Sequence, residues 1–148
     1  VMSQISADTP TMIIMTVFFA PVLEEIIFRG IIQKGLINKG WKPWTAILFS
    51  AVIFGIVHAN PWQFVGALLL GTVLGVVYQK TKSLLLSMFL HAFNNLISCL
   101  LILYTGSESI ADAAGLSPWI VLGVGIIIFA LFYYLFTRKY RVYYQGQE

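Results

Sequence analysis

Long apolar runs, separated by short polar breaks, make up most of this chain of 148 residues. No run of ten residues alternates strictly between apolar and polar positions, as a strand of an outer-membrane barrel does. Four of the runs begin at or just after a proline, where a helix tolerates a missing N–H. The pattern predicts five helices, at residues 10–36, 44–58, 61–79, 83–104 and 118–136.

The composition indicates that these helices lie in a membrane. Hydrophobic residues make up 59% of the chain and charged residues only 10%, and the mean hydropathy is +0.86, whereas a soluble domain carries about 25% charge. A water-soluble enzyme, a disordered chain and a nucleic-acid-binding protein are therefore disfavoured. A single cysteine, Cys99, excludes an intrachain disulfide and a thiolate metal cluster. We expect an all-α polytopic transmembrane helical bundle in contact with lipid, with residues 1–148 forming a single domain.

Only the fifth run is an uninterrupted apolar span of the roughly 20 residues that a lone transmembrane helix needs. The second run is about 22 Å long at 1.5 Å per residue, and the first and fourth contain charged or amide side chains. Such helices are stable in lipid when they shield one another's polar groups, so we expect a bundle around a polar interior. Ala67, Gly71 and Gly75 predict a helix face on which a neighbour packs closely. Pro21 lies inside the first run and should expose backbone carbonyls near a cluster of charges.

The distribution of Lys and Arg predicts the orientation of the chain in the membrane. Eight of the nine cations fall on one side of the predicted helices, and the ninth, Arg29, lies within a helix. By the positive-inside rule this side is cytoplasmic, so we expect a plasma (inner) membrane protein with a cytoplasmic C-terminus and with residues 108–112 on the opposite side. Because the chain opens with Val1 and no basic segment precedes its first apolar run, we expect no signal peptide and a longer protein with further N-terminal helices. The eight cations are Lys34, Lys39, Lys42, Lys80, Lys82, Arg138, Lys139 and Arg141.

Glu24, Glu25 and Arg29 are charged residues inside the first predicted helix. A charge at the bilayer centre costs about 2.5–3.5 kcal/mol on insertion scales. Glu25 and Arg29 have i,i+4 spacing with the acid first, which is the favourable order for an ion pair. Glu24 points about 100° away around the helix and has no local partner. We therefore expect Glu25 and Arg29 to form a structural pair and Glu24 to be the reactive carboxylate.

Four polar side chains on three helices reach similar depths in the membrane. Counted from the cytoplasmic helix ends at 1.5 Å per residue, Glu24 lies about 15 Å deep, His58 about 21 Å, His91 about 13 Å and Asn95 about 19 Å. A carboxylate can take a proton from water that a histidine positions, and a histidine with a carboxamide can donate hydrogen bonds to an oxyanion. This set of groups predicts amide hydrolysis.

Three short motifs contain these residues. Residues 24–29 read EEIIFR, residues 54–58 read FGIVH and residues 91–95 read HAFNN, which match EExxxR, FxxxH and HxxxN. In this order and spacing, over roughly residues 17–100, the chain resembles the CPBP family, which groups type II CAAX prenyl endopeptidases with bacteriocin-processing and self-immunity membrane proteins. The resemblance implies an all-helical, metal-independent intramembrane glutamate endopeptidase whose cavity opens toward the cytosol.

The resemblance also implies a role for each motif residue. Glu24 and His58 would activate the water, and His91 with Asn95 would form the oxyanion hole. It implies no cofactor and no metal, and a substrate that is a membrane-associated peptide or a lipidated protein. Because the family is diverse in substrate, its name does not establish that prenylated proteins are cleaved. The residues that would support the site are Glu25, Arg29 and Phe54.

Other interpretations of the same residues remain open. In a zinc peptidase, Glu24, His58 and His91 would be ligands of Zn²⁺ and Glu25 the general base, although the HExxH helix of many zinc peptidases is absent. In a non-catalytic immunity or scaffold protein, the polar cluster would bind a peptide or partner. A proton-coupled transporter would also place Glu and His at mid-depth, but the sequence shows no inverted repeats of the kind common in transporters.

A nucleophilic serine or cysteine is less well supported. Ser87 precedes His91 by four residues, but no G-x-S-x-G elbow accompanies it, and Cys99 lies two turns beyond His91. We therefore expect the reaction to use activated water.

Overall fold

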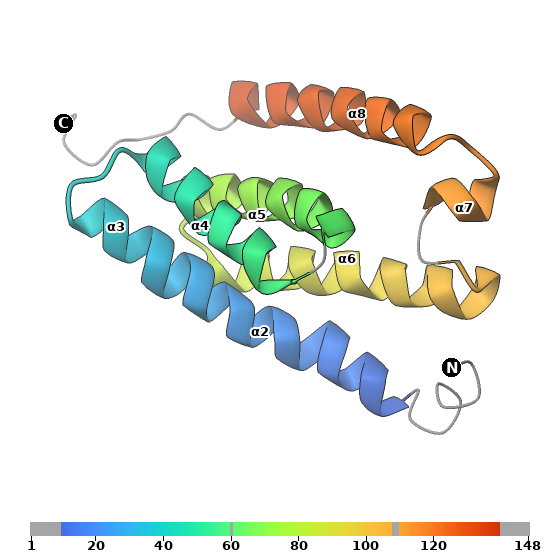
Figure 1. Ribbon diagram of the computed structural model, residues 1–148. Coiled ribbons are helices and arrows are strands. Elements are labelled where there is room, and N and C mark those ends of the chain that lie inside the picture. The colour runs from blue at the N-terminus through green and yellow to red at the C-terminus, as the bar shows by residue number, and fades with distance from the viewer. Residues whose placement is uncertain (1–9, 60, 108–109, 140–148) are drawn as a thin grey trace. The chain divides into compact units, whose positions relative to one another are not determined.

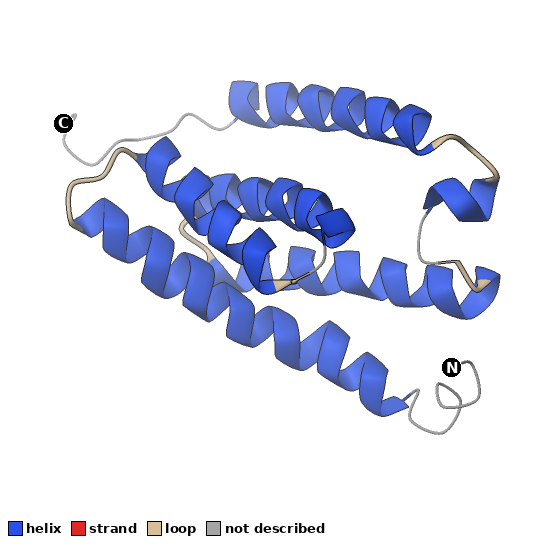
Figure 2. Cartoon of the chain, viewed as in Figure 1, coloured by secondary structure: helices blue, strands red, loops and turns tan. Residues whose placement is uncertain are grey.

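The computed structural model describes residues 10–59, 61–107 and 110–139 (Figure 1). Within these ranges every regular element is a helix and no strand is present (Figure 2). The predicted all-α class is therefore confirmed. The expectations about Arg141 and about residues 108 and 109 concern positions outside the described ranges.

The first helix runs over Pro10–Asn38. Two π-helical stretches, η1 (Met15–Phe19) and η2 (Ile26–Gln33), alternate in it with the α-helical stretches α2 (Ala20–Glu25) and α3 (Lys34–Asn38). In a π-helical turn a backbone N–H bonds to the carbonyl five residues back rather than four, as the Ala20 N–H does to Met15 O. Such turns are frequent at functional sites. Here they flank the stretch that contains both glutamates.

The other four predicted helices are also present, with their ends shifted by a few residues. They are α4 (Pro43–Val57), α5 (Pro61–Thr81), α6 (Leu84–Thr105) and α8 (Pro118–Lys139). A proline begins α4, α5 and α8, where its missing N–H has no helical partner to lose. A further short helix, α7 (Ile110–Ala114), is not among the predicted ones, because its sequence IADAA contains no apolar run.

Within the described ranges, four helices are long and apolar enough to cross a membrane, namely Pro10–Asn38, Gln63–Thr81, Leu84–Thr105 and Pro118–Leu135. The fifth predicted membrane helix, α4, has 15 residues, and its length of about 22 Å is less than the roughly 30 Å of a hydrocarbon core. Large apolar side chains such as Phe18, Leu48 and Leu85 are exposed, as lipid contact requires. The chain is therefore an integral, polytopic membrane protein. The identity of its membrane and the side of its C-terminus remain predictions.

Contacts divide the chain into two compact units, Val1–Leu96 and Ile97–Glu148. All the predicted site residues belong to the first unit. Within that unit, α4 packs against α5 and against η2, around a core of Phe28, Phe54 and Ala67. The single-domain organisation stays a prediction.

The small residues of α5 allow close contact with its neighbours. A Cβ built at Gly71 would lie 3.2 Å from Ala51 Cα, and one built at Gly75 would lie 2.9 Å from both Ile47 Cγ2 and Gln33 Oε1. Interiors are packed too densely for such atoms to be added without a shift of the neighbours. The predicted close-packing face is confirmed, and it brings the first helix and α4 against the same segment of α5.

Candidate active site

Glu25 and Arg29 form a buried ion pair in the first helix, as their spacing predicts. Arg29 Nη1 donates to Glu25 Oε1 over 2.8 Å, and the two side chains are 1% and 0% exposed. Either charge alone in such a place would be strongly destabilising, because nothing would replace its hydration. The ion pair gives Arg29 one hydrogen-bond acceptor, but a guanidinium has five N–H groups that need acceptors when they are buried.

Arg29 and Gln33 also donate to the backbone of α5. Arg29 Nη2 bonds to Gly71 O and Gln33 Nε2 bonds to Gly75 O, each over 2.9 Å. We call these two parallel hydrogen bonds the buried ladder. Gln33 is not among the residues predicted from the sequence, although it is completely buried. A signal for it exists, because Arg29 and Gln33 share the four-residue spacing of Gly71 and Gly75.

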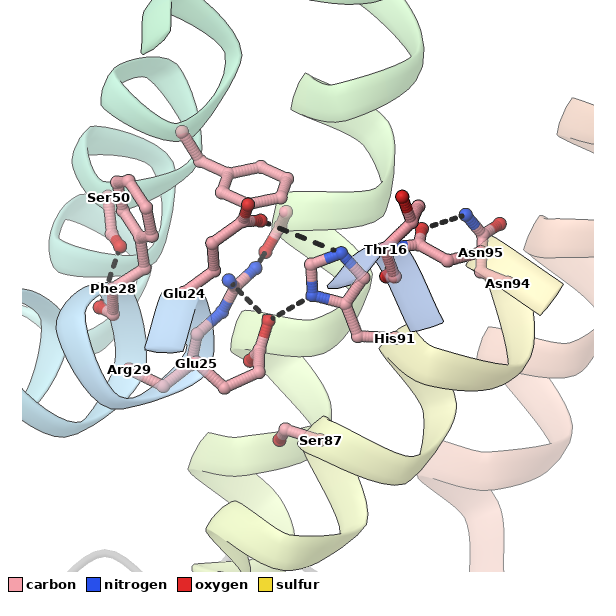
Figure 3. Close-up of polar contacts among 12 residues, drawn as sticks. Thr16, Glu24, Glu25, Phe28, Arg29, Ser50, Ser87, His91, Asn94 and Asn95 are labelled. Carbon is pink, nitrogen blue, oxygen red and sulfur yellow. Dashed lines mark hydrogen bonds and ion pairs between the residues drawn. The ribbon is translucent and has the colours of Figure 1, made fainter. Parts of the chain in front are cut away.

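His91 of α6 contacts this ion pair through Glu25 (Figure 3). Its Nδ1 lies 2.9 Å from Glu25 Oε1, and 2% of the side chain is exposed. Because Glu25 is ion-paired with Arg29, its carboxylate acts as an acceptor and His91 Nδ1 carries the hydrogen. This tautomer leaves His91 Nε2 to face the rest of the site.

Glu24 lies against the other nitrogen of the same ring. His91 Nε2 is 3.7 Å from Glu24 Oε2, which is too long for a direct hydrogen bond but short enough for one water molecule to contact both atoms. The Glu24 side chain is 30% exposed, whereas that of Glu25 is 0% exposed. The offset of the two glutamates around the helix predicts this difference in direction, and Figure 3 shows both carboxylates beside the imidazole.

Phe54 of α4 links His58 to the same cluster. The buried Phe54 ring lies 4.8 Å from the ring of His58 and 5.6 Å from that of His91, between centroids, and Arg29 Cζ lies 5.0 Å from the Phe54 centroid. His58 Nδ1 is 2.7 Å from Phe54 O. A carbonyl only accepts, so this nitrogen donates, and Nε2 of the neutral ring is an acceptor. Phe54 thus gives the FxxxH motif a physical basis.

Asn95 is bonded to the first helix rather than to the carboxylates. Its Nδ2 donates to Thr16 O over 2.9 Å, and its Oδ1 accepts from Asn94 Nδ2 over 3.4 Å. Thr16 lies five residues before Pro21, so a carbonyl near this proline is indeed used by a polar side chain. The sequence indicates an exposed carbonyl here, but it does not identify Thr16 or its partner.

Two buried serines make contacts with the backbone in this unit. Ser50 Oγ donates to Phe28 O over 2.8 Å and so connects α4 to η2. Ser87 Oγ donates to Ser83 O, just before α6, over 3.4 Å. The Ser87 hydroxyl is therefore directed at the backbone of its own segment.

The zinc set considered from the sequence is not assembled. Among residues 10–59, 61–107 and 110–139, no three His, Cys, Asp or Glu side chains come together in a way that could hold a metal ion. The proposed ligands Glu24, His58 and His91 therefore do not form the ligand group that a structural or catalytic zinc needs.

Known proteins resemble the chain over the region that contains this site. "Putative membrane peptidase YdiL" of Bacillus subtilis (strain 168) is 40% identical over 86 residues, which are 58% of this chain and 35% of that protein. "UPF0177 protein YaiF" of Lactococcus lactis is 36% identical over 90 residues, 60% of this chain and 39% of that protein. "CAAX prenyl protease 2" of Arabidopsis thaliana is 27% identical over 132 residues, 76% of this chain and 42% of that protein. No solved structure matches the chain significantly.

The matched region spans less than half the length of each of these relatives. The family described as type II CAAX prenyl endopeptidase Rce1-like matches residues 6–97. This match covers more than half of the chain and includes all three motifs. The chain therefore belongs to the type II CAAX prenyl endopeptidase Rce1-like family.

Proposed function

We propose that the chain is the core of an intramembrane endopeptidase that hydrolyses a peptide bond in a membrane-associated peptide or lipidated protein. The observation that carries the proposal is the arrangement around His91, where Glu25 is buried and ion-paired while Glu24 is partly exposed and 3.7 Å from the ring. Two relatives whose names describe a membrane peptidase and a CAAX prenyl protease support the same class of reaction.

Glu24 is the general base in this reaction. Its carboxylate takes a proton from water while the water oxygen bonds to the carbonyl carbon of the substrate. The same proton then passes to the amine nitrogen as the C–N bond breaks. Since His58 Nδ1 donates to Phe54 O, His58 Nε2 is left to accept a hydrogen bond from the water and orient it.

His91 and Asn95 donate hydrogen bonds to the carbonyl oxygen of the substrate as it becomes negative. His91 Nδ1 already bonds to Glu25, so donation from Nε2 uses the doubly protonated ring, which then faces two carboxylates. Asn95 Nδ2 has a second hydrogen besides the one that it gives to Thr16 O. One such preorganised donor is worth about 10²–10³ in rate in a well-studied peptidase.

Glu25 and Arg29 support the site by holding the His91 ring, and Phe54 supports it by separating the two histidines. The distribution of Lys and Arg supports a plasma-membrane protein with a cytoplasmic C-terminus, and the family resemblance implies a cavity that opens toward the cytosol. A substrate that is anchored in the cytoplasmic leaflet by its own apolar segment or lipid would reach such a cavity.

The test uses the full-length protein in proteoliposomes with synthetic membrane-associated peptides, with and without a lipid chain, and identifies the products by mass spectrometry. We expect cleavage at one peptide bond by the unchanged protein and loss of cleavage in Glu24→Gln. Asp112→Asn in α7 is the matched control, because it removes one carboxylate from the second unit. It should cleave at the rate of the unchanged protein.

Equal cleavage by the unchanged protein and Glu24→Gln would remove Glu24 from the mechanism. No cleavage of any peptide, together with saturable binding of one of them, would instead favour the non-catalytic immunity or scaffold interpretation.

A further inference from the structure

The hydrogen-bond register of η1 assigns the Thr16 carbonyl a backbone donor that residue 21 cannot supply. The Ala20 N–H bonds to Met15 O, five residues back. In the same register the next N–H, that of residue 21, would bond to Thr16 O. Residue 21 is a proline and has no N–H. The Thr16 carbonyl therefore needs a donor from elsewhere, because a buried or half-buried backbone carbonyl is rarely left unpaired.

The donor is the Asn95 side chain from α6. Asn95 Nδ2 lies 2.9 Å from Thr16 O, an ordinary N–H···O distance. Since a carbonyl can only accept, this contact decides which end of the Asn95 amide is nitrogen. Asn94 Nδ2 donates to the other end, Asn95 Oδ1, over 3.4 Å. Figure 3 shows the Asn95 amide directed at Thr16.

We propose that Pro21 is a positioning residue for the reaction: by removing one backbone N–H, it keeps Thr16 O available to orient the Asn95 amide, so that the second N–H of Asn95 faces the substrate oxyanion. The inference rests on the proposed function. Pro21 makes no contact with substrate in this scheme and acts through Thr16 and Asn95.

Orientation matters at this position because the two ends of an amide have opposite effects on an oxyanion. The nitrogen end of Asn95 donates a hydrogen bond to it, whereas the oxygen end would repel it. Donors that are already oriented require no reorganisation during the reaction. An N–H at position 21 would compete with Asn95 for Thr16 O, and would so release the amide to rotate.

The first test compares Pro21→Ala with Pro43→Ala in full-length protein. Alanine at position 21 supplies the missing N–H, and we expect kcat to fall about fivefold to tenfold, the factor that corresponds to one hydrogen bond, with little change in KM. Pro43 begins α4, where an added N–H has no helical acceptor, so Pro43→Ala should keep the original kcat. In the Asn95→Ala background, Pro21→Ala should lower kcat no further, because its effect passes through Asn95.

The second test measures folding and needs no substrate. Asn95→Ala removes the donor to Thr16 O and should lower the midpoint of denaturant-induced unfolding. Adding Pro21→Ala should raise that midpoint again, since the new backbone N–H at position 21 can bond to Thr16 O, but it should not restore kcat. Adding Pro43→Ala to Asn95→Ala should not raise it. This measurement separates failure of the inference from failure of the proposed function, because it holds for a protein that cleaves nothing.

An unchanged kcat in Pro21→Ala would overturn the proposal, as would losses in kcat that simply multiply in the double variant. A double variant less stable than Asn95→Ala would also overturn it, because the restored N–H would then not satisfy Thr16 O.

Discussion

Glu24 and Glu25 are consecutive residues of α2, yet they lie in two different regions of the first unit. Glu25 belongs to the buried cluster, which we define as Glu25, Arg29, Gln33 and His91, at 0–2% exposure each. Glu24 belongs to the site edge, which we define as Glu24, His58 and Asn95, all three half-buried. In the buried cluster, each side chain bonds to a protein group on a different helix or a different turn.

The difference in burial predicts that one region mainly stabilises the fold and that the other mainly serves the reaction. Buried ionic groups whose partners are all protein are held in one arrangement, and losing one partner strands the other. Half-buried groups are partly accessible to solvent, so they can bind water and substrate. Substitutions of Glu25, Arg29 and Gln33 should therefore change folding first, and those at the site edge should change turnover first. Substitutions of His91, which is buried but faces Glu24, should change both.

The sharpest test of this difference exchanges the carboxylate of Glu24 for an amide. Glu24→Gln keeps the size and the hydrogen-bonding capacity of the side chain but cannot take a proton from water. General-base catalysis is typically worth about 10²–10⁴ in rate, so we expect kcat to fall by that factor. The midpoint of unfolding should stay within experimental error of the unchanged protein. A strongly lowered midpoint in Glu24→Gln would place this residue in the buried cluster.

The same exchange at the next residue should act on stability. Glu25→Gln removes the charge that Arg29 and His91 face, and Arg29→Ala removes the other half of the pair. Breaking a buried pair costs about 3–5 kcal/mol, which should appear as a lower free energy of unfolding and less folded protein. Turnover per folded molecule should fall less than in Glu24→Gln. Variants that remain fully stable but lose turnover would assign Glu25 and Arg29 to the reaction itself.

A smaller effect is expected from one methyl group at the buried ladder. In Gly75→Ala the added Cβ would lie 2.9 Å from Gln33 Oε1 and from Ile47 Cγ2. Overpacking of this kind costs about 1–3 kcal/mol. Gly66→Ala in the same helix is the matched control, because a Cβ there meets no atom within 4 Å, and alanine favours the helix by about 0.5–1 kcal/mol. Equal stability of the two variants would show that the close approach at Gly75 is not needed.

Those features of the two regions that depend on residues close together in the sequence can be predicted from it. Apolar runs and prolines predict the five main helices, and i,i+4 spacing predicts the pair of Glu25 and Arg29. Helical rotation predicts that Glu24 points elsewhere. The depths counted along the helices indicate that His91 and Glu24 lie at a similar level, but depth does not give direction around an axis. The contact between His91 and Glu25 therefore needs the structure.

Two further contacts that the sequence did not predict involve backbone atoms. Gln33 and Asn95 bond to the carbonyls of Gly75 and Thr16, and every residue type has a carbonyl, so side-chain motifs do not reveal such partners. The π-helical turns are missed for a similar reason, because Pro21 indicates an interrupted hydrogen-bond pattern without specifying its register.

Removal of metal should have the smallest effect on turnover. It tests whether a metal ion joins residues of the site edge to His91 of the buried cluster. If Glu24 works with water, and if His91 is held by Glu25, no step at the site edge needs a metal ion. We expect turnover to be unchanged after dialysis against a strong chelator, and elemental analysis of the purified protein to give no stoichiometric zinc. The zinc interpretation predicts instead that Glu24, His58 and His91 bind one ion together. The structure does not group these three side chains as metal ligands, so they would have to move together to bind the ion. Turnover that disappears on chelation and returns with one zinc per chain would merge the site edge with the buried cluster into a single metal centre.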